Sequence, residues 1–364
     1  MLQDCNKRNF GLGTKTFLIN AATYKPSFMK PISLFPMAAV AASLLLGGTA
    51  MAQQLSGAGA TFPAPLYQRW AVEYNKLHPE VQVNYQSVGS GAGVKNFTQG
   101  VVDFGASDAA MSDEEIAKVK NGVVMIPAAA GSIVLAYNLP GVPELKLSRE
   151  NYVDIFLGKI TKWNDPAIAK NNAGVTLPEL PIIVAYRSDG SGTTFVFTKH
   201  LSAISPEFKE EVGEDKSVTF PVGQGGKGNE GVTAIIKQAP GSIGYVEFGY
   251  AEGNDLSVAS LQNKSGNFIK PTSESGASTL AHIEFPANLR IWPADPTGAE
   301  DYPIATFTWL LLYKKYDDAN ELKALKDFVT YGLTDGQKFA PELGYIPLPA
   351  PVVEKAKAAL ATIE

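Results

Sequence analysis

Cysteine and histidine are scarce in this chain of 364 residues. The only cysteine, Cys5, lies near the N-terminus, so the chain from Gln53 onward has no thiol and can form no disulfide. Only three histidines occur, and no cluster of histidine and aspartate indicates a two-metal hydrolytic centre. Beyond residue 52 there is also no apolar run long enough to span a bilayer and no internal repeat. These absences leave a globular chain that is large enough to bury its own core.

The N-terminal segment has the features of a secretory signal peptide. Lys30 is followed by an apolar run, and small residues around Ala52 form a cleavage signal. We therefore expect a signal peptide at 29–52 that is cleaved near Ala52. Since no lipoprotein-type cysteine lies near the cleavage site, we expect release into the periplasm. Residues 1–28 precede Met29 and are interpreted as an upstream mis-start.

Length and charge limit the partners of the exported part. Five of the 31 basic residues and one of the 36 acidic residues precede residue 53, which leaves a net charge of −9 over the remaining 312 residues. So acidic a chain is not expected to bind nucleic acid. Its length predicts two domains. Any anion would have to bind through local dipoles and neutral donors, because the overall field repels it.

The most informative stretch joins a predicted strand to a predicted helix. Residues 181–186 are apolar and β-branched, as in a buried strand, and 195–201 suit a short helix. Between them, Arg187 and the run from Asp189 to Thr193 place a guanidinium, hydroxyls and glycines at a helix N-terminus. Free amides, the helix dipole and these side chains can together hold a tetrahedral oxyanion. An ordinary capped loop is the alternative.

Two turns nearer the N-terminus have the same character. Thr61 stands before prolines that fit a first helical turn, and an ordinary N-cap is its alternative role. A predicted strand at 81–86 leads into Gly89-Ser90-Gly91-Ala92-Gly93. We reject a dinucleotide site here, because the helix that follows is too short for such a crossover. The loop around Lys227 is no P-loop, since Gly228 stands where Ser or Thr is required.

A single carboxylate accompanies these anion-binding turns. Asp108 follows the predicted strand at 101–106, at an edge where open α/β sheets bind ligands. Phosphate near neutral pH still has a proton to donate, since phosphomonoesters lose their last proton at about pH 6. An Asp acceptor would bind protonated phosphate and disfavour ionised sulfate by at least about 1–3 kcal/mol. Closing a turn is the alternative role of Asp108.

The remaining pattern places other elements. Apolar strand segments are predicted at 123–130 and 131–138, with small residues between them, and a strongly apolar strand at 304–313. Helices at 320–331 and 351–363 are expected to dock on the first domain. Two aromatic residues, Phe156 and Trp163, are interpreted as core.

Taken in order, the motifs resemble the periplasmic phosphate-binding proteins of bacterial ABC-type phosphate importers. The resemblance covers essentially the whole exported part and rests on Gly57 to Pro63, Gly89-Ser90-Gly91, Asp103 to Asp108 and Asp189 to Thr193.

This resemblance implies an α/β fold of the two-domain periplasmic binding protein class (class II type), with a ligand cleft between the domains and a two-stranded hinge. The expected boundaries are 53–129 and 300–364 for domain I and 130–299 for domain II. Residues 252–299 are weakly patterned and predict no site residue.

The resemblance also implies a set of ligand residues from both domains. Asp189 would restrain a guanidinium and partly offset its charge, and Asp108 would accept the proton of the ligand. The expected phosphate-binding residues are Thr61, Phe62, Ser90, Asp108, Arg187, Ser191, Gly192 and Thr193.

No cofactor or metal is implied. The expected partners are inorganic phosphate, as HPO4 or H2PO4, and the transmembrane permease subunits of an ABC importer. The protein itself is expected to be a monomer and not an enzyme.

Two other functions stay open on the residues alone. A receptor for another tetrahedral oxyanion, such as arsenate, sulfate or molybdate, would use similar donors, and arsenate matches phosphate in protonation and shape. An exported hydrolase of phosphate esters or acyl groups would use Ser191 or Ser90 as nucleophile, although neither lies in a G-x-S-x-G motif. Only His78, His200 and His282 could act as bases, and His200 is expected on a helix surface.

Overall fold

The computed structural model describes residues 52–281 and 283–364. The expected mis-start, the expected signal peptide up to residue 51, Cys5 and His282 lie outside the described residues. The strands are β1 (Gln53–Gly59), β2 (Val81–Ser87), β3 (Phe104–Ser107), β4 (Val123–Asn138), β5 (Lys146–Leu147), β6 (Ile183–Arg187), β7 (Gln224–Gly226), β8 (Ser242–Glu247), β9 (Ser257–Val258), β10 (Ser260–Gln262), β11 (Phe268–Ile269) and β12 (Ala305–Tyr313).

Helices alternate with these strands along the chain. They are α1 (Ala64–Leu77), α2 (Ser90–Thr98), α3 (Asp113–Ile116), α4 (Arg149–Phe156), α5 (Pro166–Ala169), α6 (Gly192–Ile204), α7 (Pro206–Glu211), α8 (Gly228–Gln238), α9 (Phe248–Glu252), α10 (Ser273–Ala281), α11 (Ala319–Leu333) and α12 (Ala350–Ala361), with 3-10 turns η1 (Asp335–Phe339) and η2 (Pro341–Leu343).

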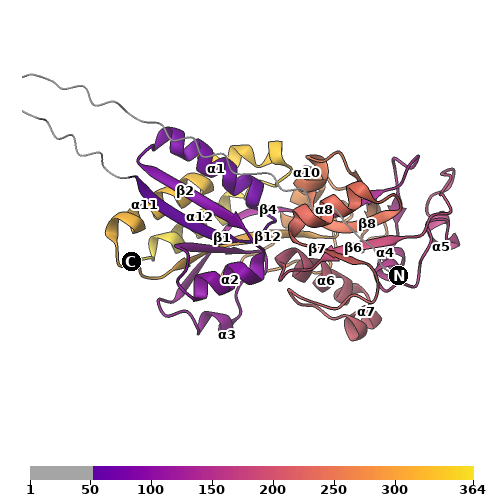
Figure 1. Cartoon of the computed structure of the whole chain (residues 1–364), viewed down its shortest axis with the longest axis horizontal. Helices are drawn as coiled ribbons and strands as arrows, with labels where there is room; N and C mark the ends of the chain where they lie inside the picture. Colours follow the sequence, from indigo (N-terminus) through magenta and orange to yellow (C-terminus); the bar gives the residue numbers. More distant parts are fainter. Residues whose placement is uncertain (1–51, 282) are drawn as a thin grey trace, which may run out of the picture. The chain divides into compact units, whose positions relative to one another are not determined.

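A mixed sheet of nine strands organises the part of the chain that the structure describes. Its order is β2-β1-β3-β12-β4-β8-β6-β7, and β9 pairs beside β4. The pairs β1·β2, β1·β3, β6·β7 and β6·β8 are parallel, whereas β12 and β4 run antiparallel to their neighbours. In Figure 1, β4 and β12 lie between the strands β1 and β2 and the strands β6 and β7. A smaller sheet has the order β11-β10-β5.

Strand β4 belongs to both halves of the large sheet. It pairs with β12 from Val123 to Ser132, and from Ile133 onward it pairs with β8. We call the part with β2, β1, β3 and β12 the first half, and the part with β8, β6 and β7 the second half. The predicted break inside β4 is wrong, because the strand runs unbroken over 16 residues. The small residue Gly131 is needed there for packing, since a Cβ would lie 2.9 Å from the Phe62 ring.

Strand β12 lies between β3 and β4 and confirms the predicted apolar strand. Its register with β4 shifts between Thr308, opposite Ala129, and Trp309, opposite Pro127, so that Ala128 is left out of the pairing. Such a bulge suits a proline, which has no N–H for the ladder. The carbonyl of Ala128 instead accepts a hydrogen bond from Nε2 of Gln337 at 3.0 Å.

The helices and the core follow the sequence pattern closely. Helix α11 packs on β1 and α1, and α12 packs on β4 and α11, so the C-terminal helices dock on the first half as expected. Phe156 and Trp163 are fully buried, which confirms both as core residues. The Ser112 hydroxyl and the Glu115 carboxylate form a capping box at the start of α3, which accounts for the acidic first turn.

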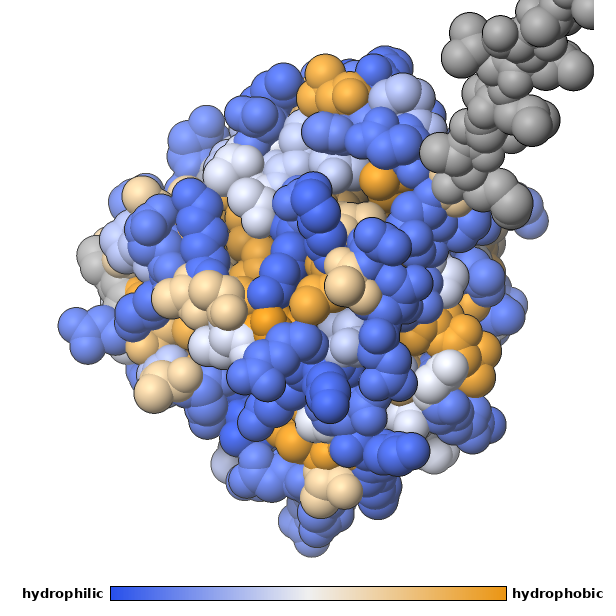
Figure 2. Space-filling view, turned by 90° about the vertical axis from the view of Figure 1, so that its left-hand side faces the viewer, coloured by the Kyte–Doolittle hydropathy of each residue, from blue (hydrophilic) through white to orange (hydrophobic). Residues whose placement is uncertain are grey.

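Large hydrophobic side chains are exposed at Val72, Leu77 and Val101. Figure 2 shows one face of the molecule as mostly hydrophilic, with hydrophobic residues in small separate groups. Within 52–281 and 283–364, no helix combines the length and the apolar character that crossing a membrane requires.

Candidate functional site

Three loops bring helix N-termini to one place. They follow β1, β2 and β6 and lead into α1, α2 and α6. The first two are neighbours because β1 and β2 are parallel and end at the same edge of the sheet. The third comes from the second half and touches them, since the amide of Gly91 donates a hydrogen bond to the carbonyl of Gly190 at 2.8 Å.

Thr61 is buried at the start of α1, but it does not cap that helix. Pro63 occupies the N-cap position and makes no side-chain cap. The Thr61 hydroxyl oxygen instead accepts two hydrogen bonds from Asn229, from its amide at 3.1 Å and from its Nδ2 at 2.7 Å. The N-cap alternative is therefore wrong. A hydroxyl that accepts twice still has its one proton to donate, so Thr61 is available as a donor.

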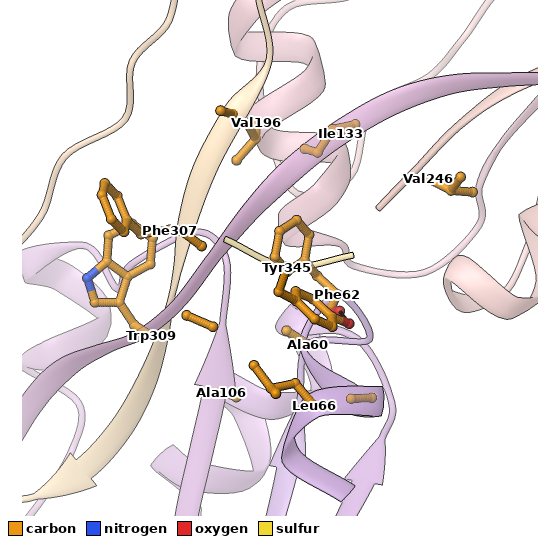
Figure 3. Close-up of a cluster of buried hydrophobic side chains, with 14 of the residues drawn as sticks. Ala60, Phe62, Leu66, Ala106, Ile133, Val196, Val246, Phe307, Trp309 and Tyr345 are labelled. Atoms are coloured by element: carbon orange, nitrogen blue, oxygen red, sulfur yellow. Dashed lines mark hydrogen bonds between the residues drawn. The ribbon is translucent and has the colours of Figure 1, made fainter. Parts of the chain in front are cut away.

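Phe62 is held through its backbone and its ring. The hydroxyl of Tyr345 donates to the Phe62 carbonyl at 2.6 Å. The two rings lie beside each other in the buried cluster of Figure 3, with centroids 6.1 Å apart. This anchoring fixes the backbone at the start of α1, where the first amides have no partner inside the helix.

Ser90 and Asp108 meet at the carboxyl ends of the first-half strands. Ser90 is the first residue of α2, is fully buried, and its hydroxyl oxygen accepts a hydrogen bond from the Asp108 amide at 3.3 Å. Asp108 directly follows β3 and is 1 % exposed. Its backbone carbonyl accepts a hydrogen bond from Nε1 of Trp292 at 3.1 Å.

One of the two oxygens of the Asp108 carboxyl group accepts a hydrogen bond from another side chain. Oδ1 accepts a hydrogen bond from the Thr308 hydroxyl at 2.7 Å. Burial raises the pKa of Asp108 to about 7, against the opposing effects of the Thr308 hydroxyl, the Arg187 charge and the Ser90 hydroxyl. This carboxyl group therefore changes protonation near neutral pH.

Arg187 and Asp189 form a bidentate ion pair in the second half. Nε and Nη2 of Arg187 donate to the two carboxylate oxygens of Asp189 at 2.8 and 2.6 Å, and the arginine is 5 % exposed. Burial acts to raise the pKa of Asp189, but the hydrogen bonds and charge of Arg187 and the amide of Gly228 lower it overall. Nη1 lies 3.2 Å from the Thr193 hydroxyl. The guanidinium is thereby fixed and largely neutralised, with one edge directed toward α6.

The start of α6 supplies amides and hydroxyls. The Ser191 hydroxyl oxygen caps the helix by accepting from the Thr194 amide at 3.0 Å. The Ser191 carbonyl takes the Phe195 amide, which leaves the first two amides of the helix, those of Gly192 and Thr193, directed out of its N-terminus. Ser191 and Thr193 are both fully buried.

Gly192 marks where the two halves converge. A Cβ at this position would lie 2.6 Å from Oδ2 of Asp108 and 2.6 Å from the hydroxyl oxygen of Ser90. Oδ2 of Asp108 therefore faces the N-terminus of α6, on the side away from Thr308. The structure thus brings together all eight residues of the predicted set, Thr61, Phe62, Ser90, Asp108, Arg187, Ser191, Gly192 and Thr193, with Asp189 behind Arg187.

Sequence reasoning assigned no role to three residues of this site. Asn229 connects Thr61 of the first half to Thr193 of the second, with its Nδ2 at 2.7 and 3.4 Å from their hydroxyl oxygens. Thr308 and Trp292 bind the side chain and the backbone of Asp108. The glycine-rich polar loop that contains Asn229 could be recognised in the sequence. Trp292 lies in the stretch for which no site residue was expected, and that expectation is wrong for its contact with Asp108.

His200 is not on a helix surface. It is 1 % exposed, its Nδ1 lies 2.7 Å from the Ala294 carbonyl, and its Nε2 lies 3.0 Å from the Tyr152 hydroxyl. Burial lowers its pKa to about 4, against the effect of the Ala294 carbonyl, so the ring is neutral near pH 7. The expectation failed because α6 is packed around most of its circumference, with buried residues on both sides of its apolar stripe.

The chemistry of the site is that of an anion receptor. Its donors are backbone amides, hydroxyls and one arginine whose charge is offset by a carboxylate. Among the described residues, no three His, Cys, Asp or Glu side chains cluster as a metal site would require. A small, multiply charged anion with one proton to donate would match these donors and the free oxygen of Asp108.

Comparisons with known proteins show the family of this chain. The model of the PBP superfamily domain matches residues 47–335. A phosphate-binding protein PstS of Pasteurella multocida is 46% identical over 314 residues, which cover 85% of this chain and 90% of that protein. The chain belongs to the PstS phosphate-binding protein family. The PstS protein of Haemophilus influenzae is 44% identical over 85% of this chain and 92% of its own length.

Solved structures of phosphate-binding proteins share the fold. A phosphate-binding protein described as PfluDING, bound with phosphate, has a TM-score of 0.69 at 22% identity and covers 84% of this chain and 93% of that one. A putative phosphate ABC transporter substrate-binding protein from Clostridium perfringens, also with bound phosphate, has a TM-score of 0.61 at 20% identity over 82% of this chain and all of that one. The fold is therefore that of the two-domain periplasmic binding proteins, as expected.

Proposed function

We propose that this protein captures inorganic phosphate in the periplasm and delivers it to the membrane permease of an ABC-type importer. The observation that carries the proposal is the single free carboxylate oxygen, Oδ2 of Asp108, among helix N-termini and hydroxyls that can only donate to an anion. A ligand that fits must accept many hydrogen bonds and donate one. Protonated phosphate does both, whereas fully ionised sulfate cannot donate.

In this proposal the ligand is held from both halves of the sheet. The amide of Phe62 and the hydroxyls of Thr61 and Ser90 donate from the first half. From the second half, the amides of Gly192 and Thr193, the hydroxyls of Ser191 and Thr193 and the guanidinium of Arg187 donate, while Asp189 holds the guanidinium in place. Asp108 accepts the proton of the ligand.

The names of the relatives support the choice of ligand and of partner. The PstS proteins at 44–46% identity are named for phosphate binding, and structural neighbours are described with bound phosphate. One neighbour is described as an ABC transporter substrate-binding protein. We therefore propose permease subunits of an ABC importer as the partner of a monomeric receptor.

We further propose that the two halves correspond to two domains, 53–129 with 300–364 and 130–299, joined by a two-stranded hinge. The change of partner in β4 between Ser132 and Ile133 supports a hinge at this point. Contacts between the halves would then form on closure. They include the Ser87 hydroxyl with Glu230 at 2.9 Å and the ion pair of Glu115 with Lys216.

Catalysis is not part of the proposal. The hydroxyl oxygens of the two candidate nucleophiles, Ser90 and Ser191, accept hydrogen bonds from backbone amides. His200 is engaged by Tyr152 and Ala294, and His78 is paired with Glu80 at the surface. A nucleophilic serine needs a base within hydrogen-bond reach, and neither of these histidines contacts Ser90 or Ser191.

Calorimetry tests the ligand. The purified protein is freed of bound phosphate by reversible unfolding and titrated with phosphate, arsenate and sulfate near pH 7. Tight binding of phosphate and at least about tenfold weaker binding of sulfate are expected from the loss of one buried hydrogen bond to a charged group. Equal affinities for phosphate and sulfate would overturn the role of Asp108.

A matched pair of variants sharpens this test. Asp108→Asn replaces one of the two carboxylate oxygens by an NH2 group, which can donate a hydrogen bond. The variant should therefore bind sulfate more tightly relative to phosphate. Asp317→Asn removes the same charge from an exposed position and should change neither the sulfate affinity nor the phosphate affinity.

Sequencing the N-terminus of protein from the periplasmic fraction checks the expected cleavage near Ala52.

A further inference from the structure

We infer that Thr308 is a positioning residue that selects which oxygen of Asp108 faces the ligand and keeps that oxygen an acceptor. The inference rests on the proposed function and extends it to the origin of the discrimination between protonated and fully ionised oxyanions. Thr308 acts through Asp108 and is not assigned a contact with the ligand.

Strand register brings the two residues together. Strands β12 and β3 are antiparallel, and Trp309 is the partner of Ser107. One step further, Thr308 stands opposite Asp108, just beyond the end of β3. Side chains alternate along a strand, so Thr308 points away from Phe307 and Trp309, which belong to the cluster in Figure 3. Its hydroxyl reaches Oδ1 of Asp108 at 2.7 Å.

The bulge in β4 lies at the same place. The register shift falls directly beside Thr308, between it and Trp309. Bulges redirect side chains and occur often beside functional sites. On the other side of β12, the indole of Trp309 is held by a hydrogen bond from its Nε1 to the Leu289 carbonyl at 2.7 Å. Thr308 is fully buried beside these fixed neighbours, and the Tyr67 hydroxyl also lies near its hydroxyl.

The number of protons makes the contact selective. A threonine hydroxyl has one proton, and in this geometry it is donated to Oδ1. Oδ1 is thereby occupied, and Oδ2, which faces the N-terminus of α6 and Gly192, is left to the ligand. A hydrogen bond donated to Oδ1 is stronger when the carboxyl group is charged. The Thr308 hydroxyl therefore favours the ionised carboxylate.

The hydrogen bond from Thr308 matters because burial favours the neutral form of Asp108. Burial raises the pKa of Asp108 to about 7, and the Thr308 hydroxyl is the largest of the effects that oppose it, ahead of the Arg187 charge and the Ser90 hydroxyl. The other titratable groups whose charge would act on Asp108 are Tyr67 of α1, Tyr85 of β2, Glu247 of β8 and Tyr345. Burial raises the pKa of each of these four well above its ordinary value, which favours the uncharged form of each.

Arg187 is the positively charged group that still favours the ionised form of Asp108 when the Thr308 hydroxyl is removed. Without that hydroxyl the pKa of Asp108 rises further, and the protonated form persists to higher pH. A protonated Asp108 can donate a hydrogen bond to an anion without a proton. Loss of the hydroxyl should therefore admit sulfate.

The test compares Thr308→Val, which keeps the shape and removes the hydroxyl, with Thr308→Ser, which keeps the hydroxyl and removes the methyl group. Phosphate and sulfate are titrated calorimetrically into each purified protein at several pH values between about 5 and about 9. For Thr308→Val we expect about tenfold weaker phosphate binding near pH 7 and sulfate binding that extends to higher pH than in the unchanged protein. Thr308→Ser should restore the ratio of the two affinities.

Thr306→Val provides the matched control. Thr306 is also fully buried in β12, but its hydroxyl donates a hydrogen bond to the Phe307 carbonyl at 3.0 Å instead of to Asp108. Its removal should leave the affinity ratio and the pH profile unchanged.

Three results would overturn the inference. The first is an unchanged affinity ratio and pH profile in folded Thr308→Val. The second is a Thr308→Ser protein that loses discrimination to the same extent as Thr308→Val. If Thr308→Val does not fold, Thr308→Ala takes its place, and the third overturning result is unchanged discrimination in that variant. A wild-type protein that binds no phosphate would instead refute the proposed function.

Discussion

The two halves of the sheet each bring a buried carboxylate to the same site, and they surround it in opposite ways. Asp189 in the second half lies in a bidentate pair with Arg187 and accepts the Gly228 amide, and its pKa is lowered. Asp108 in the first half accepts a hydrogen bond from the Thr308 hydroxyl, lies beside the Ser90 hydroxyl and has no direct cation, and burial raises its pKa to about 7.

The difference shows how one residue type serves two purposes. A carboxylate that is saturated by a guanidinium is a fixed structural charge, which holds the arginine and reduces its field. A carboxylate with one free oxygen and little compensation can respond to a proton that a ligand brings. In the proposed function, amide and hydroxyl dipoles would therefore bind the anion, and Asp108, the carboxylate with fewer partners, would respond to whether the anion carries a proton.

The largest effect on phosphate affinity is expected from adding one methyl group at Gly192, where the two halves meet. Gly192→Ala puts a Cβ 2.6 Å from Oδ2 of Asp108 and from the Ser90 hydroxyl, inside the space where an anion would have to lie. Phosphate affinity should fall at least about 100-fold, which corresponds to roughly 2.7 kcal/mol. Calorimetry measures the affinity, and thermal unfolding checks that the variant is folded. Retained affinity would mean that the ligand lies elsewhere.

The next effect concerns the pH dependence of stability in the ligand-free protein. The pKa of Asp108 is about 7 in the folded state and near 3.8 when unfolded. Below about pH 4 the group is protonated in both states. Between about pH 4 and about pH 7 the group is ionised in the unfolded chain but still protonated in the folded protein, so the free energy of unfolding falls by up to about 4 kcal/mol over this range and changes no further above it.

Asp108→Asn isolates this contribution. The difference in unfolding free energy between the unchanged protein and Asp108→Asn should fall as the pH rises from about 4 to about 7. Urea unfolding at several pH values measures it, and His200, whose lowered pKa acts with the opposite sign, cancels in the comparison. A difference that stays flat over this range would contradict the assignment of Asp108 as the responsive carboxylate.

Removing the other carboxylate should act on the ligand-free state. Asp189→Asn leaves the Arg187 guanidinium buried without its counter-charge. We expect a loss of about 2 kcal/mol in the stability of the ligand-free protein, because hydrogen bonds to charged groups contribute about this amount. Phosphate should then raise the melting temperature by more than in the unchanged protein, since the ligand would supply the missing negative charge. An equal ligand-induced shift would argue against a compensating role of Asp189.

The smallest effect is expected at the backbone of Asp108. Trp292→Phe keeps an aromatic ring against Phe195 and removes the hydrogen bond of 3.1 Å to the Asp108 carbonyl. One neutral hydrogen bond contributes about 1 kcal/mol, so phosphate affinity should fall less than tenfold. Calorimetry at constant pH measures this, and a loss comparable to that of Gly192→Ala would show that Trp292 does more than hold the loop.

Individual residues show which features of the site could be predicted from the sequence alone. Ser191 was readable as a helix start because its strand, turn and helix are adjacent in the chain, and the structure has it as the cap of α6. Thr61 looked like a cap for the same reason but is used by Asn229, which lies 168 residues further on. Local spacing predicts that a hydroxyl is at a helix start, and it does not say which distant group will engage it.

The residues that escaped prediction depend on long-range register. Thr308 reaches Asp108 only because β12 pairs with β3, across 200 residues of chain. In the sequence it is one polar residue inside an apolar strand, with no feature that sets it apart from Thr306. His200 was misplaced because periodicity alone did not reveal that the second side of α6 is also covered.

The place of β12 between β3 and β4 bears on how the protein is made. Until residues 305–313 are available, β3 and β4 each have an open edge on the side where β12 will insert. Unpaired strand edges invite association with other chains. A product that ends before Ala305 would therefore lack the central strand of the first half, and we expect it to aggregate or be degraded rather than to accumulate as a smaller receptor.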